Sequence, residues 1–326
     1  MLASDLLKVE QLVPNAVLAK AVSTYVVADD FMGSAEFYPF ATPNGGSMAL
    51  TVNRYTKGNG ASGRLIGKDY AEDTGAVNEP VTFHLKPIGA KITVDKAVAR
   101  GLTDSGKAIY VTNQVRQKSN QTKNEVARQF IDGSGEGIEI KGLRVLTDEE
   151  ERVSTDKVDI TGGATREKAE AFLEFFNKQF AKGETVEFNR IYCDAEFAAT
   201  LATFKQLLNS ATTPITIGEV QLKQFLDVPI VKIPGVDFNV EDEVTGDVYK
   251  TFYLARMDED AGIALGLPQD SIVLDMQDPF DAGSVIKEGY VECITSVVVI
   301  DPNAILRCEG VKVKAGFNTQ SFEPEE

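Results

Sequence analysis

Alternation of apolar and polar residues indicates several strands along the chain. Apolar side chains occupy positions 48, 50 and 52 and polar ones 51 and 53, and a similar period recurs at 81–85 and 91–96. Because successive side chains of a strand point to opposite faces, this pattern predicts strands that are buried on one side. Further strands are predicted at 186–193, 221–225, 229–233, 248–254, 271–274 and 289–300.

A helical period predicts one long helix over residues 107–131. This segment contains neither glycine nor proline, and its apolar residues form a thin stripe in which Ser119 and Thr122 fill a gap. A long helix with so narrow an apolar stripe is expected to lie across a surface and not inside a bundle.

Two shorter helices are predicted after it, from Thr165 to Lys182 and from Asp194 to Asn209. Each begins at a residue type that caps helix N-termini. The predicted core faces carry Ala169, Phe172, Phe176 and Phe180 in the first and Phe197, Leu201, Phe204 and Leu208 in the second. Strands and helices without a regular strand–helix alternation indicate an α+β fold.

Residues 37–79 depart from this ordered pattern. No acidic residue occurs from Phe37 to Lys68, the next eleven residues carry acids and no base, and glycine recurs throughout. A strand that runs into an excursion of this length is usually functional or disordered. Opposite charge on its two limbs favours a contact between copies of the chain over a solvated linker. The candidate inter-subunit residues are Arg54, Lys57, Arg64, Lys68, Asp69, Glu72 and Asp73.

Length and charge limit the class of protein. A chain of 326 residues exceeds the usual size of one hydrophobic core, so two substructures are expected. The net charge of −16 opposes general affinity for nucleic acid, which Lys and Arg mainly supply. No apolar run approaches the roughly 20 residues of a membrane span, and the first residues lack a secretory signal. Ahead of residue 37, a helix is predicted at 6–19 and a strand at 22–27.

Motifs of catalysis are missing from the sequence. The single histidine, His84, lies inside an alternating strand, and no nucleophile turn accompanies it. The glycines of Gly133-x-Gly-x-Gly137 follow a helix, whereas a dinucleotide loop would follow a strand and open a helix. We therefore assign no catalytic or cofactor-binding residue and expect no cofactor.

Metal and disulfide patterns are also missing. The acidic clusters at 241–243 and 258–260 lack the spacing of a calcium loop and are interpreted as solvated turns. Cys193, Cys293 and Cys308 are odd in number and far apart, so we predict reduced, structural thiols. No metal ligand is assigned.

Several local patterns follow one another in an order typical of one family. They are Ala90–Lys96, Phe130–Gly135 with Ile140–Leu143, Ile191–Leu201, Phe225–Val231, Ala261–Gly266 and the strand Thr295–Pro302 with the following 303–306. This order resembles that of the major capsid proteins of tailed bacteriophages, with the Hong Kong 97-type capsid fold. Two positions depart from the family's pattern, since Ser134 stands where Asp is frequent and Asp227 where Gly is usual.

The resemblance implies an N-terminal arm, an extended β-hairpin loop, a long spine helix, and peripheral and axial domains. On this chain the parts would be an arm at 1–36, the extended loop at 37–90, the spine helix and peripheral domain at 91–185, a mainly axial domain at 186–290, and a return strand of the peripheral domain with a C-terminal tail at 291–326.

The function implied is self-assembly into an icosahedral shell that encloses double-stranded DNA without sequence-specific binding. Expected partners are further copies in hexamers and pentamers, a portal and a decoration protein. Because the arm is short, the resemblance implies a separate scaffolding protein or none. The expected location is the virion, after synthesis in the host cytoplasm and with no membrane association. Two alternatives stay open: an encapsulin-like compartment that encloses a cargo enzyme, and a soluble enzyme with residues 37–79 as a lid.

Overall fold

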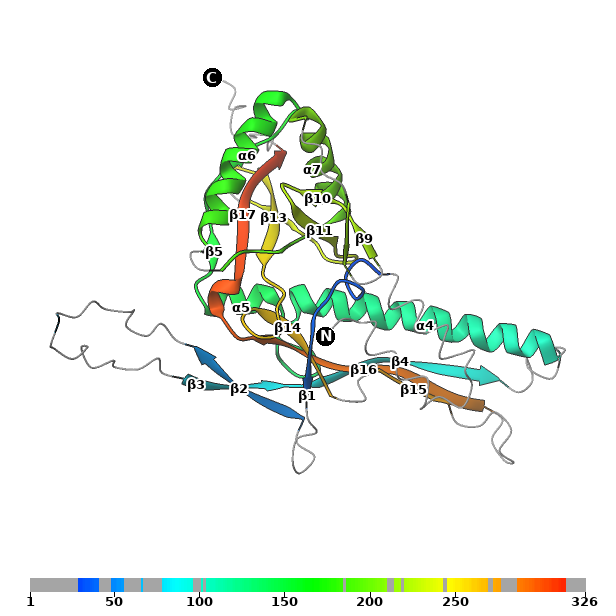
Figure 1. Ribbon diagram of the computed structural model, residues 1–326. Helices are drawn as coiled ribbons and strands as arrows, with labels where there is room; N and C mark the ends of the chain where they lie inside the picture. The colour runs from blue at the N-terminus through cyan, green and yellow to red at the C-terminus, as the bar shows by residue number, and fades with distance from the viewer. Residues whose placement is uncertain are drawn as a thin grey trace, which may run out of the picture.

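The computed structural model describes residues 29–40, 48–55, 66, 78–95, 101, 104–183, 186–209, 214–217, 220–242, 245–268, 272–276 and 286–314. Figure 1 shows an elongated base of strands and one long helix, with a lobe of strands and two helices above one end. The helix predicted at 6–19 and the strand predicted at 22–27 lie outside the described residues.

The sheet of the base is built on the long strand β16 (Ile286–Val299). It pairs antiparallel with β4 (Lys86–Asp95), β15 (Ile272–Met276) and β14 (Ile263–Pro268), and β1 (Phe37–Phe40) lies parallel to β14. The alternation read from the sequence is confirmed in β4, where Ile88 and Ile92 are buried and Lys91 and Thr93 are exposed. The buried side chains of β4 belong to the core of the base.

Helix α4 (Asp104–Asp132) covers one face of this sheet (Figure 1). Its 29 residues extend over about 43 Å at 1.5 Å per residue. The buried stripe contains Val115 and Val126, and Ser119 and Thr122 are buried between them, as the sequence predicted. The Ser119 hydroxyl is satisfied because it donates to the Val115 carbonyl at 2.8 Å. From 112 to 125 the buried residues form one narrow stripe, which confirms that this part of the helix lies across a surface. In the last turn Gln129, Phe130 and Ile131 are all buried, so the end of the helix is covered on more than one side.

The lobe contains an eight-stranded sheet with the order β10–β11–β7–β13–β17–β5, and with β12 and β6 beside it. Its strands are β5 (Val153–Ser154), β6 (Val158–Asp159), β7 (Arg190–Cys193), β10 (Gln224–Phe225), β11 (Val228–Lys232), β12 (Asn239–Glu241), β13 (Val248–Ala255) and β17 (Ile305–Lys314). A separate pair, β8 (Ile215–Ile217) and β9 (Val220–Leu222), and the short helices α5 (Leu143–Glu149) and η2 (Pro302–Ala304) complete the body.

Both helices of the lobe begin at the predicted caps. In α6 (Arg166–Ala181) the Thr165 side chain accepts from the Lys168 amide, and in α7 (Ala195–Leu207) Asp194 accepts from the Phe197 amide at 2.7 Å. The side chains predicted for their core faces are buried, except that Phe180 and Leu208 are only partly buried. The sequence reading missed Phe175 and Gln179, which are buried as well.

Some strands differ from their predicted bounds for local reasons. Only Arg190–Cys193 of the strand predicted at 186–193 pairs in the sheet, because the Asn189 side chain exchanges hydrogen bonds with the backbone of Met257. The strand predicted at 221–225 divides into β9 and β10. The β10–β11 turn is tight, with Leu226 and Asp227 at φ of 49° and 64°.

The two hydrophobic clusters group the chain in space. Strands β5 and β6 and helix α6 pack in the lobe with β7 and α7, and β14 and β16 lie in the base. The predicted domains at 91–185, 186–290 and 291–326 were defined along the sequence, whereas the two clusters are defined in space. The predicted domain bounds therefore remain a prediction. The antiparallel hairpin of β2 (Ala49–Tyr55) and β3 (Asn78–His84) extends from the base beside the lobe (Figure 1).

Candidate assembly interface

The hairpin of β2 and β3 has an inner and an outer face. In its register Leu50 lies opposite Phe83 and Thr51 opposite Thr82. On the inner face, Phe83 and Val52 belong to the hydrophobic core of the base. The outer face is polar: the Thr51 and Thr82 hydroxyls are 3.0 Å apart, and both residues are exposed. The root of the hairpin is therefore packed against the body on one side only.

Arg54 attaches this root to the body by polar contacts. Its Nε donates to the Val299 carbonyl at 3.0 Å, and its Nη1 forms an ion pair with Glu150 at 2.5 Å. Its guanidinium lies 5.7 Å from the centroid of the Phe83 ring. With 12% of its side chain exposed, Arg54 joins β2 to the end of β16 and to the residue that follows α5. These contacts are within one chain.

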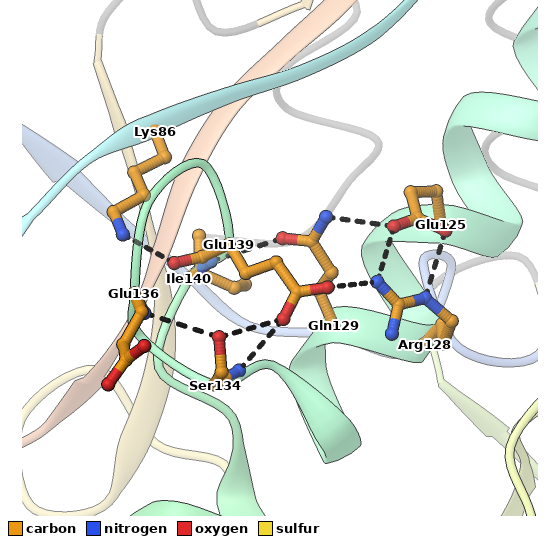
Figure 2. A network of polar contacts seen from close by, with 8 residues as sticks. All are labelled: Lys86, Glu125, Arg128, Gln129, Ser134, Glu136, Glu139 and Ile140. Atoms are coloured by element: carbon orange, nitrogen blue, oxygen red, sulfur yellow. Dashed lines mark hydrogen bonds and ion pairs between the residues drawn. The ribbon is translucent and has the colours of Figure 1, made fainter.

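Lys86 fixes the point where β3 passes into β4. Its ammonium donates to the carbonyls of Gly135 and Glu139 at 2.9 and 2.5 Å, and the Leu85 amide between the strands donates to Met48. Figure 2 shows that Lys86 reaches the connection between α4 and α5 from the sheet. Two basic side chains, Arg54 and Lys86, therefore attach the root of the hairpin to neighbouring parts of the body.

The same connection is held from α4 by a chain of charged side chains (Figure 2). Arg128 binds Glu125 and Glu139, each at 2.7 Å, and Glu139 also accepts from the amide and hydroxyl of Ser134. Hydrogen bonding to Arg128, followed by the Ser134 amide, lowers the pKa of Glu139 to about 2. The hydrogen bonds that Arg128 donates to Glu125 and then to Glu139 raise the pKa of Arg128. The network stays ionised throughout the physiological pH range.

Of the residues predicted to contact other subunits, the structure describes Arg54 alone, with the intrachain partners given above. Lys57, Arg64, Lys68, Asp69, Glu72 and Asp73 lie outside the described residues, so their assignment stays a prediction. Ile66 is described between them and is fully exposed. The sequence reading missed Lys86, Gln129 and Glu139, since polar residues in a strand or helix carry no signal of their partners.

A cavity of about 370 Å³ lies in the lobe between α7 and the turn that precedes α6. Phe197, Phe204 and Lys250 are among the described residues that line it. Burial opposes the charged form of Lys250, but its ammonium is paired with Asp194 and with Glu196, and these hydrogen bonds leave its pKa raised. A protonated, doubly paired lysine offers no free base in this cavity.

The acidic clusters and the cysteines were the other candidates for a metal or reactive site, and their described contacts are those of structural residues. Within the described residues no group of three His, Cys, Asp or Glu side chains could hold a metal ion. Asp258 caps its own turn by accepting from the amides of Asp260 and Ala261. All three cysteines are free and buried, which confirms the prediction, and burial raises the pKa of Cys293 to about 12. The described helices include none long and apolar enough to cross a membrane.

Similar folds occur among solved structures of shells. The encapsulin of a holo complex from Synechococcus elongatus superposes with a TM-score of 0.55 at 12% identity, covering 87% of each chain. The capsid of an empty GTA particle gives 0.52 at 14% identity over 86% of this chain and 89% of that one. A satellite phage P4 procapsid gives 0.50 at 13% identity over 93% of each.

No protein-family model and no curated protein matches the sequence itself. The likeness is therefore one of architecture, and it extends over nearly the whole chain. The sheet of the base, the long helix α4, the lobe and the hairpin together form the α+β arrangement of those shells, which confirms the fold predicted from the sequence. The chain has the Hong Kong 97-type capsid fold.

Proposed function

We propose that the chain is the major capsid protein of a tailed bacteriophage or prophage. Copies of it would assemble into an icosahedral shell around double-stranded DNA. The observation that carries this proposal is a shell-type fold whose hairpin is fixed at its root by Arg54 and Lys86 and extends from the body (Figure 1). Closed rings of identical subunits need two unlike surfaces on each copy, and an extending hairpin supplies one of them.

In this proposal residues 1–36 are the N-terminal arm and 37–90 the extended loop, of which the β2–β3 hairpin protrudes while β1 and the start of β4 pair in the sheet of the base. By the bounds predicted from the sequence, 91–185 is the spine helix with the peripheral domain and 186–290 the mainly axial domain. Because β5, β6 and α6 pack in the lobe, we propose instead that the base with α4 acts as the peripheral domain and the lobe as the axial domain. Partners are other copies in hexamers and pentamers, a separate scaffolding protein, a portal and a decoration protein, and the location is the virion after assembly in the host cytoplasm. The role is structural and not enzymatic.

The negative net charge of the chain supports a shell that binds enclosed DNA only weakly. A net charge of −16 opposes the release of counterions that drives binding to DNA. A DNA shell with this charge would let the duplex move while it is packaged, and we expect no sequence-specific contact with it.

The second candidate is the shell of an encapsulin-like compartment. The similarity to the Synechococcus elongatus encapsulin supports it, because that encapsulin has the same fold with a TM-score of 0.55. Both candidates make a closed shell and differ only in what they enclose.

Electron microscopy of the purified protein tests the shell, and analysis of the contents separates the two candidates. Particles isolated from cells that carry the gene would be treated with nuclease and then opened. Protected double-stranded DNA supports the capsid protein, whereas a stoichiometric co-purifying protein without DNA supports the compartment. A uniform monomer or dimer at all concentrations would contradict both and favour a soluble enzyme.

A further inference from the structure

A short turn at the junction of base and lobe belongs to neither sheet. It comprises residues 29–35, just ahead of β1, and we call it the junction turn. Figure 1 shows it in dark blue between the lobe and α4. Phe31, Met32, Ser34 and Ala35 are each at most 2% exposed. A segment without strand pairing that is buried so completely is held by its contacts with the surrounding elements.

Phe31 packs against both bodies. Its ring lies 4.9 Å, centroid to centroid, from Phe130 near the end of α4 and 6.3 Å from Tyr192 of β7 in the lobe. The rings of Phe130 and Tyr192 are 5.1 Å apart, so three buried rings meet where base and lobe touch. Aromatic pairs at such distances stabilise a contact beyond the burial of their area. Phe31 thus supplies the apolar contact of the turn with α4 and with the lobe.

Basic side chains from both bodies bind the acids of the turn. Lys123 of α4 pairs with Asp29 at 3.0 Å, and less than a fifth of either side chain is exposed. Lys232 of β11 pairs with Asp30 at 2.7 Å at a more exposed site. One cation belongs to the base and the other to the lobe. The turn therefore forms directed bonds to each body.

A third cation, Arg190 of β7, is buried beside the turn. It is 4% exposed, and its guanidinium donates to the Ser34 carbonyl at 3.3 Å and to the Asn189 carbonyl at 2.7 Å. Its Nε has no hydrogen-bond partner among the described residues. A buried charge with too few partners is destabilising, so removal of the Ser34 carbonyl would cost further stability. The lobe strand β7 is therefore coupled to the presence of the turn.

The turn is also stabilised within itself. Oδ1 of Asp29 accepts from the amides of Phe31 and Met32, each at 3.1 Å, and the Gly33 amide donates to the Asp29 carbonyl at 2.8 Å. The Ser34 hydroxyl donates to the Phe31 carbonyl at 3.3 Å. Because these bonds are local, they do not depend on the position of the lobe. The turn is a preformed unit that contacts two bodies at once.

We propose that the junction turn is a latch that fixes the position of the lobe on the base. Without its contacts the lobe turns on α4 while both bodies stay folded. The aromatic cluster around Phe172 contains no described residue of the turn, of α4 or of the base sheet, so the lobe keeps a core of its own. The other junction contacts are largely apolar, and apolar burial has no direction. This inference concerns the single subunit and goes beyond the shell function.

Two spin labels measure the position of the lobe. Gln117→Cys on α4 and Gln206→Cys on α7 are exposed sites, and the native cysteines are buried. Labelled protein is diluted into an excess of unlabelled protein, so that only distances within one copy are recorded. We expect Phe31→Ala to widen the distance distribution at least about twofold, because the lobe gains freedom on the base. Ile88→Ala, in the core of the base on β4, is the matched control and should leave the width unchanged.

Exchange of one ion pair tests the latch without a change in the core. Lys232→Glu places like charge opposite Asp30 and should widen the distribution, more at low than at high salt. The double variant Asp30→Lys with Lys232→Glu restores an opposite pair and should narrow the distribution again. Both residues are partly exposed, so both variants should fold, and circular dichroism verifies this.

The outcomes decide the latch independently of shell formation. A distribution that stays narrow in Lys232→Glu, or that widens equally in Ile88→Ala, would overturn it. If Phe31→Ala does not fold, the ion-pair variants alone decide. Because every distance is measured within one copy, the absence of shells would contradict the proposed function and leave this test intact.

Discussion

The core of the lobe and the root of the hairpin are held together in different ways. In the lobe, Phe172 is fully buried and its ring lies within 6.4 Å, centroid to centroid, of six other phenylalanine rings. At the hairpin root, by contrast, Val52 and Phe83 supply a small apolar contact, and Arg54 and Lys86 supply the directed bonds.

This difference separates stability from orientation. Burial of apolar area has no direction, so an aromatic cluster contributes free energy without fixing the angle of a distant element. Hydrogen bonds and ion pairs contribute less net free energy, but they depend on geometry. We infer that the lobe keeps the subunit folded and that the root aims the hairpin at a neighbour.

Phe172→Ala should have the largest effect, a loss of about 3–5 kcal/mol in the free energy of unfolding, because it leaves a cavity among the packed rings. Urea denaturation measures it. Phe180→Ala is the matched control on the same helix, and since Phe180 is only partly buried its loss should be clearly smaller. Equal losses for the two would show that the cluster is not centred on Phe172.

Arg54→Met should cost about 1–3 kcal/mol, because Glu150 and the Val299 carbonyl lose their partner at a site that is largely covered. Hydrogen exchange should rise at the amides of β2 and β3, and shells should be irregular or missing. Arg166→Met is the control: its ion pair with Glu170 is exposed, and its loss should stay within about 0.5 kcal/mol. Unchanged exchange in the hairpin would contradict an orienting role for Arg54.

Glu139→Gln should make the free energy of unfolding depend less on pH at acid pH. The pKa of Glu139 is lowered in the folded chain from 4.5 to about 2, so the native protein binds fewer protons than the unfolded one in this window. Its contribution is full above about pH 4.5 and is lost as the pH falls to about 2. Thermal unfolding at pH 7, 4 and 3 should show a smaller difference between variant and unaltered protein as the pH falls. A constant difference would mean that Arg128 does not hold this carboxylate.

Replacement of Lys57–Asp73 by a short Gly-Ser linker should have the smallest effect on stability and the largest on assembly. A doubling of loop length changes closure by only about 0.6 kcal/mol, so a shorter loop should leave the subunit folded. Each copy would lose a contact with its neighbour, and sedimentation should find no closed shells. Normal shells would refute the assembly role, and an unfolded subunit would show that the segment belongs to the core.

Reversal of charge at Lys57, Arg64 and Lys68 sharpens the same comparison. It should impair assembly more at low salt, where screening is weaker, and leave the unfolding midpoint nearly unchanged. Arg54 does not belong in this set, because its intrachain contacts would make a reversal there a test of the hairpin root.

The sequence determined those elements whose signal is local. The period of apolar residues placed α4, α6, α7, β4 and β13, and the side chains of Thr165 and Asp194 placed two helix starts, because caps act within three residues. The order of these parts was enough to identify the fold. The short helix α5 was not predicted, since seven residues carry too little helical periodicity. The strand β14 was not predicted, because residues 263–267 are all buried and its apolar positions do not alternate.

Only the tertiary structure decided what the polar residues do. Arg54 and Glu150 are 96 residues apart, and the sequence placed Arg54 in a basic limb because charge can be counted along a chain but pairing cannot. Gln129 and Gln179 look like solvated positions of their helices, yet both are buried and bonded to other segments. A buried polar group needs a partner with defined geometry, and that partner is fixed by the folding of distant segments and not by local spacing. Apolar side chains gain from any burial, so their pattern alone was sufficient.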